Sequence, residues 1–153
     1  MYKYSLLIVV FAFLPACILA QNAKNRAASN KNKAADLAAY KVIFDITSGD
    51  TAAHKTVIRQ LKGISQARPD AQLEVAIYSD ALGMVMKDQS TIADAILELS
   101  SNNRARFKVC AATMKRNNVD KSQLVAGVDV VPDAIYEIVA RQHEGWGYIK
   151  VAQ

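Results

Sequence analysis

Five short apolar segments, alternating with segments of helical spacing, constrain the fold of this chain more than any other feature of its sequence. They are rich in β-branched and aromatic residues, as strands are, and they span residues 40–46, 73–78, 106–110, 129–131 and 146–151. Strands that alternate with helices across short loops are typical of a parallel sheet with helices on both faces. We therefore predict an α/β fold with three α/β/α layers around a mainly parallel five-stranded sheet.

The first helical segment shows this spacing most clearly. Its apolar stripe consists of Ala53, Val57, Ile58, Leu61 and Ile64. The residues that we expect on the opposite, solvent-facing side are His54, Lys55, Arg59 and Lys62. His54 is thus predicted to be a solvated helix residue rather than a ligand.

The length and composition of the chain fit one globular domain. The chain has 153 residues, of which 52% are apolar and 22% are charged, so it can bury a core. Its net charge is +5, but six of the 19 basic residues precede Val42, against one of the 14 acidic residues, so 13 of each remain. Because the folded part is neutral and lacks the basic surface that binds phosphate backbones, we do not expect nucleic-acid binding.

The first 20 residues have the organisation of a secretory signal peptide. A short segment with Lys3 precedes an apolar run over residues 6–14, and Ala20 ends a small-residue cleavage site before Gln21. The apolar run is too short to cross a bilayer of about 30 Å as a helix, so we expect no membrane span. These features predict cleavage after Ala20 and a periplasmic or secreted protein.

Lipidation is the alternative to cleavage after Ala20. The residues Leu14-Pro15-Ala16-Cys17 resemble a bacterial lipobox, which would make the product a lipoprotein anchored at Cys17, although a proline just before the small residue fits poorly. Residues 21–39 form a polar lead-in that cannot bury enough apolar surface to fold, and we interpret it as a flexible tether. The α/β domain is expected to span residues 40–153.

Cys110 is the candidate for chemistry. It would be the only cysteine left after cleavage, which excludes an internal disulfide. It ends a predicted strand and precedes a helical turn, where a helix N-terminus together with Lys108 and Lys115 would favour the thiolate. The opposite interpretation is that Cys110 is a small buried hydrophobe that closes a strand, as many free cysteines are. The residues alone leave both interpretations open.

The carboxyl ends of parallel strands share one edge of a sheet, and α/β proteins bind their ligands there. Right-handed crossovers place the loops after all the strands on that edge. Because Ser48, Asp50 and Asp80 follow the first two strands, we interpret them as a candidate pocket edge on the same side as Cys110. The strand order, which decides which loops adjoin, does not follow from the sequence.

Motifs for several other chemistries are absent from the sequence. It has no glycine-rich dinucleotide loop, no phosphate-binding loop, no nucleophile elbow and no pair of His or Cys residues at metal-ligand spacing. We therefore expect no cofactor and no metal. The two histidines, His54 and His143, lie in different predicted helices, which argues against a catalytic Cys–His pair.

Four segments of the chain resemble a known family. They are residues 107–110 and 113–114, the turn over 127–132, and the ending over 142–149. Their order and spacing are similar to those of the DsrE/DsrF-like (DsrEFH-like) sulfur-relay proteins, over residues 40–151. The resemblance implies a compact parallel α/β domain and assembly as a homo-oligomer, a trimer or a hexamer. It also implies that Cys110 matches the cysteine that carries sulfur as a persulfide in some members.

An export signal departs from the pattern of the relay proteins in this family, which work in the cytoplasm. Our leading hypothesis is an exported, sulfurtransferase-like sulfur carrier that uses a Cys110 persulfide in sulfur relay or in the handling of sulfide and polysulfide. The alternative is a non-catalytic oligomeric binding or scaffold protein with an inert Cys110. A third hypothesis is redox sensing through an intermolecular Cys110 disulfide. The sequence identifies neither the sulfur donor nor the acceptor, and it leaves open whether the protein is an enzyme.

Overall fold

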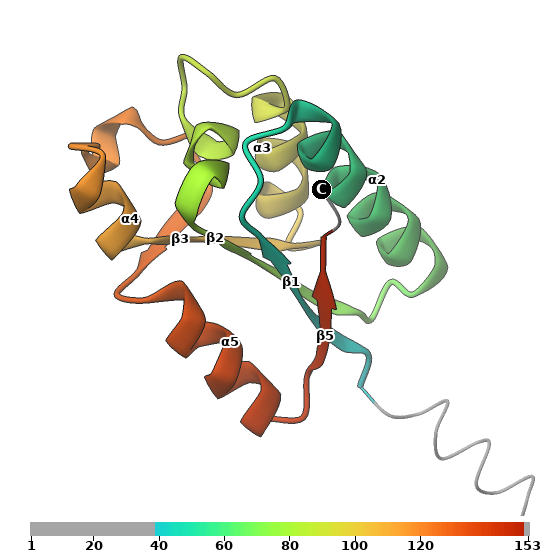
Figure 1. The fold of residues 1–153 in the computed structure, drawn as a ribbon. Coiled ribbons are helices and arrows are strands. Elements are labelled where there is room, and N and C mark those ends of the chain that lie inside the picture. The colour runs from blue at the N-terminus through green and yellow to red at the C-terminus, as the bar shows by residue number, and fades with distance from the viewer. Residues whose placement is uncertain (1–38, 152–153) are drawn as a thin grey trace, which may run out of the picture. The chain divides into compact units, whose positions relative to one another are not determined.

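The computed structural model of the protein describes residues 39–151. Its elements are, in chain order, β1 (Lys41–Ile46), α2 (Thr51–Ala67), β2 (Gln72–Ile77), η1 (Ser79–Val85), α3 (Ala93–Ser101), β3 (Arg106–Cys110), α4 (Ala111–Arg116), η2 (Lys121–Gln123), β4 (Val128–Val131), α5 (Ala134–His143) and β5 (Gly147–Lys150) (Figure 1). The predicted signal peptide, the lipobox and all of the lead-in except residue 39 lie outside the described residues. Within residues 39–151, no helix combines the length and the apolar character needed to cross a membrane.

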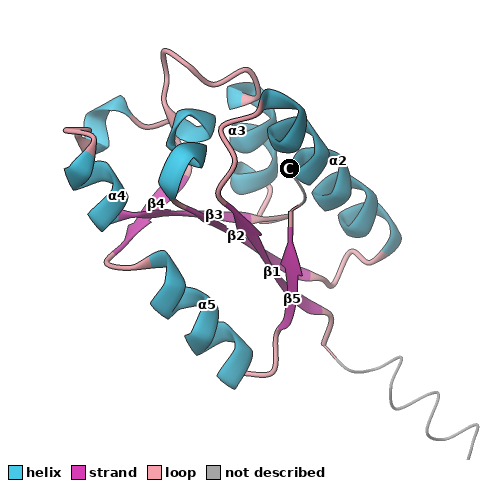
Figure 2. Ribbon diagram, in the orientation of Figure 1, coloured by secondary structure: helices cyan, strands magenta, loops and turns pink. Residues whose placement is uncertain are grey.

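The five strands form one parallel sheet in the order β4-β3-β2-β1-β5 (Figure 2). This confirms the parallel five-stranded α/β fold that the alternation of segments predicts. The predicted strand bounds agree with the structure to within one residue at either end. Turn residues and β-branched runs are local signals, and local signals suffice to place strands.

The strand order explains how the helices are layered. From β1 to β4 each new strand is added on the same side of the previous one, whereas β5 pairs with β1 at the other end. Because crossovers between parallel strands are right-handed, a reversal of direction moves the connecting helix to the opposite face. Figure 1 shows the result, with α5 on one face of the sheet and α2, α3 and α4 on the other.

The two faces of the sheet bury very different amounts of apolar surface. The face under α2, α3 and η1 holds the main core, in which Phe44, Val75 and Phe107 are fully buried. The face under α5 holds a small cluster, which we call the α5 cluster, made of Ile43, Ala76, Cys110, Ala134, Ile138 and Trp146. Successive strand residues point to opposite faces, so Val109 joins the main core while Cys110 joins the α5 cluster. The three predicted layers are present but unequal.

The prediction that His54 faces solvent is wrong. The imidazole is buried in the first turn of α2, and its Nε2 donates a hydrogen bond to the Ser48 carbonyl oxygen at 2.8 Å. The helix begins after Asp50, whose carboxylate accepts a hydrogen bond from the Ala52 N–H at 2.9 Å. The loop before α2 therefore supplies the polar partner that lets the ring be buried, and helical spacing carries no information about that loop.

A buried ion pair holds α5 against the sheet. Glu74 is fully buried on β2, and Arg141 of α5 donates from Nε to its Oε1 at 3.1 Å. Burial raises the pKa of Glu74, and the Arg141 guanidinium opposes that effect. The same guanidinium also pairs with Glu137 at 2.8 Å and lies over the ring of Trp146, 5.1 Å from its centroid. These contacts fix both the position and the direction of α5.

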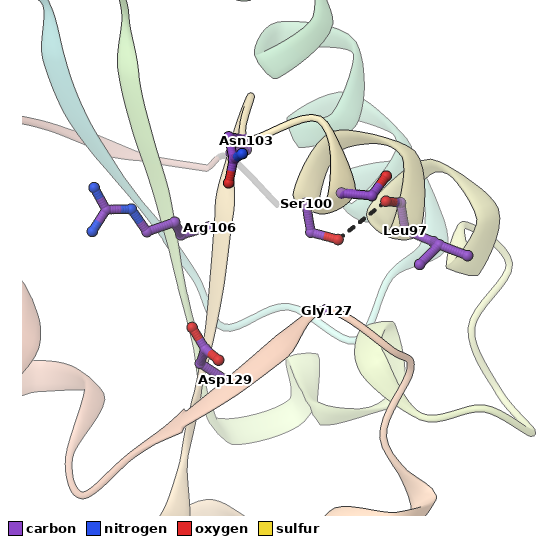
Figure 3. A pocket seen from close by; sticks show the side chains of 8 residues that line it. Leu97, Ser100, Asn103, Arg106, Gly127 and Asp129 are labelled. Atoms are coloured by element: carbon purple, nitrogen blue, oxygen red, sulfur yellow. Dashed lines mark hydrogen bonds between the residues drawn. The ribbon is translucent and has the colours of Figure 1, made fainter.

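Gly127 occupies a turn that only glycine fits without strain. Its φ is +84°, a left-handed conformation, and an added Cβ would collide with the Ser100 hydroxyl and lie 2.8 Å from Ser100 Cβ. Figure 3 shows Gly127 facing Ser100 of α3, whose hydroxyl donates to the Leu97 carbonyl at 3.1 Å. Gly145 has a similar φ of +81°, but nothing lies near the position that its Cβ would take. A side chain at Gly145 would therefore meet backbone strain alone, whereas one at Gly127 would meet both strain and steric overlap.

We expect Gly127→Ala to destabilise the protein more than Gly145→Ala. Gly145→Ala should lower the free energy of unfolding by about 1–2 kcal/mol, the cost of a left-handed non-glycine residue. Gly127→Ala should lower it by about 2–4 kcal/mol, because overlap with Ser100 adds to that cost. Urea denaturation of both variants measures the difference. Equal losses would show that Ser100 moves aside without penalty.

Candidate functional site

Cys110 is the last residue of β3, at the carboxyl edge of the sheet. It is the sole cysteine within residues 39–151, and its side chain is 5% exposed. The position agrees with the prediction that this thiol ends a strand and precedes a helix. Its surroundings decide whether it can react.

The N-termini of two helices approach the Cys110 sulfur. Cys110 is itself the N-cap residue of α4, so the first free N–H groups of that helix, at Ala112 and Thr113, face its side chain. Val131 of β4 pairs with Cys110 in the sheet, and α5 begins three residues later with Ala134. Asp133 caps α5 by accepting hydrogen bonds from the Ile135 and Tyr136 N–H groups, which leaves the Ala134 N–H available to the sulfur.

These N–H groups favour the thiolate. Burial raises the pKa of the Cys110 thiol, but hydrogen bonds offered by the Ala134, Thr113 and Ala112 N–H groups and by the Thr113 hydroxyl outweigh it. The pKa of Cys110 is therefore lowered below its ordinary value. The Cys110 side chain forms no regular capping hydrogen bond with α4. The effect of the N–H groups is therefore to stabilise the charged form of the sulfur.

The two lysines that the sequence suggests as thiolate partners lie near Cys110 in the chain. Lys108 points to the same face of β3 two residues earlier, but its Nζ donates to Asp129 at 2.9 Å. Lys115 is exposed in the last turn of α4. The largest contributions that lower the Cys110 pKa come from backbone N–H groups and a hydroxyl. Stabilisation by the two lysines stays a prediction.

The three residues of the candidate pocket edge lie in the loops after β1 and β2, on the same edge as Cys110. Ser48 Oγ accepts a hydrogen bond from the Asp50 N–H at 3.2 Å, and Asp50 caps α2. Asp80 lies beside Gly49, whose added Cβ would be 3.1 Å from its carbonyl oxygen. Within the described part of the chain, no hydrogen bond or ion pair joins these residues to Cys110. Their structural roles are therefore local, and their part in a pocket stays a prediction.

Sequence reasoning missed a polar row that runs from Cys110 across the α5 face of the sheet. Tyr78 follows β2 and packs against the α5 cluster. Lys150 Nζ lies 5.8 Å from the centroid of the Tyr78 ring and donates to Asp45 at 3.1 Å. Tyr148 donates to the other Asp45 oxygen at 2.6 Å. Alternation along each strand predicts the face of each residue, but only the strand order places them side by side.

Tyr78 stays a neutral phenol next to the thiol. Burial, followed by the charge and hydrogen bonding of Asp45, raises the pKa of Tyr78 to about 12. The negative charges of Asp133 and Cys110 act in the same direction. Tyr78 therefore adds an uncharged ring with one hydroxyl group to the surroundings of the α5 cluster.

Two surface hollows lie away from this site. One, of about 500 Å³, lies where β3 and β4 begin and is lined by residues that include Ser100, Arg106, Gly127 and Asp129 (Figure 3). The other lies between the ends of α2 and α3. Neither is lined by Cys110, so neither adjoins the candidate chemistry at the carboxyl edge of the sheet. Within residues 39–151, no three His, Cys, Asp or Glu side chains are grouped to hold a metal ion.

The arrangement suits a sulfur nucleophile that works without a histidine base. His54 is engaged with the Ser48 carbonyl, and His143 is exposed at the far end of α5, opposite the end that meets Cys110. A thiol that ionises through backbone N–H groups needs no adjacent base to remove its proton. The site can therefore present a thiolate to an electrophilic sulfur atom.

Comparison with known proteins identifies the family. The DsrE/DsrF-like family model matches residues 17–151. A solved structure described as a protein of unknown function, MTH1491, from Methanobacterium thermoautotrophicum has 31% identity and a TM-score of 0.69, and the match covers 72% of this chain and 98% of that one. The ychN protein from E. coli, at 14% identity and a TM-score of 0.61 over 73% of this chain and 98% of its own, shares the fold. No curated protein matches the chain. Because the family model spans most of its length, this chain belongs to the DsrE/DsrF-like family.

Proposed function

We propose that this protein is an exported, sulfurtransferase-like sulfur carrier in which Cys110 takes up a sulfur atom and passes it on. Membership of the DsrE/DsrF-like family is consistent with sulfur-relay-type proteins. The observation that carries the proposal is the thiol of Cys110 between the N-termini of α4 and α5. Nucleophilic cysteines work as thiolates, and helix N-termini are a recognised means of stabilising them.

Sulfur uptake begins when the Cys110 thiolate attacks a sulfane sulfur of the donor, for example inorganic polysulfide. A bond forms between Cys110 Sγ and that sulfur, the sulfur–sulfur bond of the donor breaks, and its electron pair leaves with the shortened polysulfide. The resulting persulfide anion has the same charge as the thiolate, so the same N–H groups stabilise it. For delivery, an acceptor thiolate attacks the outer sulfur, and the electron pair of the broken bond returns to Cys110. No external oxidant or reductant is needed.

Incubation with polysulfide should add whole sulfur atoms to the native protein at Cys110. Intact-mass measurement with and without reductant should show a reducible adduct in the parent protein and none in Cys110→Ser. Ser65→Ala serves as a control, because Ser65 lies on α2, on the opposite face of the sheet (Figure 1), and the change leaves the thiol in place. A Cys110→Ser variant that took up sulfur as the parent does would refute the assignment.

The alternative function is that of a binding or scaffold protein with an inert Cys110. The observation in its favour is the burial of the thiol, which is 5% exposed. The same experiment separates the two functions when an alkylating reagent replaces polysulfide. A sulfur carrier should react in the native state, whereas an inert core thiol should react only after denaturation. If Cys110 of the native protein reacts with neither reagent, the binding or scaffold function is favoured.

Export would decide the compartment in which this protein works and the partners that it meets. Its support is the signal-like sequence of residues 1–20, with its apolar run and its small-residue site at Ala20. An exported carrier would meet sulfide and polysulfide outside the cytoplasm rather than a cytoplasmic acceptor. The intact mass of protein purified from its native export route should correspond to a chain that begins at Gln21. A lipidated chain that begins at Cys17 would replace soluble export with membrane anchoring.

We also propose that the protein assembles with copies of itself through the outer face of α5, as the resemblance to trimeric or hexameric relay proteins suggests. That face carries Ile135, Tyr136 and Val139, which are 58%, 74% and 43% exposed. Large apolar side chains at adjacent helical positions are typical of a protein–protein contact. Tyr148 of strand β5 is also 43% exposed.

Tyr136→Glu should shift the protein towards a monomer, because it places a charge in the centre of the proposed contact. Light scattering coupled to size-exclusion chromatography measures the mass in solution. Leu97→Glu is the matched control, since Leu97 is 46% exposed on α3, on the other face of the sheet. A monomeric parent protein would rule out self-assembly. An equal decrease in the measured mass of both variants would show that the contact does not lie on α5.

A further inference from the structure

The ammonium group of Lys150 is held at the carboxyl edge of the sheet by two side chains. Its Nζ donates to Asp45 Oδ1 at 3.1 Å and to Thr47 Oγ1 at 3.0 Å. Asp45 is the partner of Lys150 in the pairing of β1 with β5, whereas Thr47 follows the last residue of β1. The side chain of Lys150 therefore extends forward along β1, to the edge at which the strands end.

The strand register places this ammonium group in the same row of the sheet as the Cys110 thiol. The last pairs of β1 with β2 and of β2 with β3 are in register, and Thr47, Tyr78 and Cys110 come directly after them. Tyr78 continues the pairing, because its N–H donates to the Ile46 carbonyl oxygen at 3.3 Å. Neighbouring strands lie about 4.8 Å apart, so the backbone positions of Thr47 and Cys110 are about 10 Å apart.

The Tyr78 ring lies between the two ends of this row. Lys150 Nζ is 5.8 Å from the centroid of the ring, and Tyr78 also packs against the α5 cluster, to which Cys110 belongs. Burial, together with the charge of Asp45, raises the pKa of Tyr78 to about 12, so its hydroxyl stays neutral. The row therefore offers a nucleophile at one end, a cation at the other and an uncharged aromatic surface in between.

The ammonium group is open to solvent, whereas the carboxylate that holds it is not. The side chain of Lys150 is 44% exposed and that of Asp45 is 7% exposed. The second oxygen of Asp45 accepts a hydrogen bond from the Tyr148 hydroxyl at 2.6 Å. An ammonium group has three N–H donors, and the contacts within residues 39–151 use two of them. An anion that approaches from solvent therefore meets Lys150 first.

Stability alone does not account for this ion pair. Burial of a charge is costly, and apolar side chains of similar size often stabilise a protein as well as a buried ion pair does. The pair with Asp45 also fixes the position of Lys150, because it holds a flexible side chain in one place. A cation that is fixed in this way needs little reordering when a ligand binds.

We propose that Lys150 binds the charged end of an anionic sulfane-sulfur donor, such as inorganic polysulfide, while the other end of the same donor meets Cys110. Asp45 and Thr47 hold the ammonium group in position for that contact. This role of Lys150 rests on the proposed function of Cys110 as a sulfur carrier, and it selects donors by their charge. A donor without a negative charge gains nothing from Lys150.

A short sulfur chain has the length and the charge that this row requires. Sulfur–sulfur bonds are about 2 Å long, so a tetrasulfide dianion that is hydrogen-bonded to Lys150 at one end reaches across a row of about 10 Å. The Cys110 thiolate forms a bond with the terminal sulfur nearest to it, the adjacent sulfur–sulfur bond breaks, and its electron pair leaves with the other three sulfur atoms. The products are the Cys110 persulfide anion and a trisulfide dianion, whose far end still lies on Lys150.

The rates at which two donors consume the Cys110 thiol, followed by intact mass on the complete protein, test this role. Sodium tetrasulfide supplies a dianion, and dimethyl trisulfide is a neutral sulfane-sulfur donor. Lys150→Gln removes the positive charge and keeps a hydrogen-bond donor for Asp45. It should slow the reaction with tetrasulfide about ten-fold, the effect of one hydrogen bond to a charged group, and should change the reaction with dimethyl trisulfide less than about two-fold.

The ratio of the two rates isolates the charge of the donor. Both reactions use the same thiolate, so a change in its ionisation or in the packing around it alters both rates. Lys62→Gln is the matched control, because it removes one positive charge from an ion pair with Glu98, at 2.6 Å, on α2 and on the other face of the sheet (Figure 1). Its rate ratio should equal that of the parent protein.

Three results would overturn this role of Lys150. They are an unchanged rate ratio in Lys150→Gln, an equal loss of rate with both donors, and a loss of the same size in Lys62→Gln, which would reflect net charge alone. A ratio that falls only in Lys150→Gln supports the role. A parent thiol that reacts with neither donor refutes the carrier function and this role with it, whereas sulfur uptake with an unchanged ratio in Lys150→Gln refutes this role alone.

A double variant keeps the test decisive if Lys150→Gln does not fold. Asp45→Asn combined with Lys150→Met leaves no charge buried without a partner, and the new amide oxygen can still accept from Tyr148. The net charge of the protein is unchanged, so only the ammonium donor is lost. A selective loss of rate with tetrasulfide supports the role of Lys150, and a rate ratio equal to that of the parent overturns it.

Discussion

The buried ion pair between Glu74 and Arg141 is the interaction on which the candidate site depends most. It fixes α5, the one helix within residues 39–151 that covers its face of the sheet, and so fixes the Ala134 N–H beside Cys110. Loss of one partner from such a pair costs about 3–5 kcal/mol, because the other charge stays buried and unpaired. Arg141 also contacts Glu137 and Trp146, which limits the orientations open to α5. A change far from the thiol can therefore alter its ionisation.

The unequal layers of the fold explain where chemistry is located. The main core under α2, α3 and η1 supplies most of the apolar burial, whereas α5 leaves part of its face to polar side chains. The row of Cys110, Tyr78, Asp45 and Lys150 lies on that less covered face, at the carboxyl edge of the sheet. One face thus provides stability, and the other can carry reactive and charged groups close together.

The thiol at Cys110 shows how two structural elements can cooperate on one atom. Helix α4 is short, and on its own it offers two N–H groups to the sulfur. The second helix, α5, contributes because β4 lies next to β3 and ends beside Cys110. Hydrogen bonds to an anion outweigh the burial that would otherwise keep the thiol neutral. Among the effects that lower the pKa of Cys110, the largest come from backbone groups rather than from the lysines suggested by the sequence.

The sequence by itself determined the strands, the parallel α/β class and the place of Cys110 at a strand end, because alternation, helical spacing and turn residues are local patterns. It failed at His54, whose partner is a carbonyl in a preceding loop. It could not find Tyr78 or the contact of Lys150 with Thr47, since residues distant in sequence meet only once the strands have paired. The tertiary structure decided the order β4-β3-β2-β1-β5, and with it the face on which α5 lies. The physical reason is that strand pairing is made by backbone hydrogen bonds common to every residue, so its order leaves no pattern in any single segment.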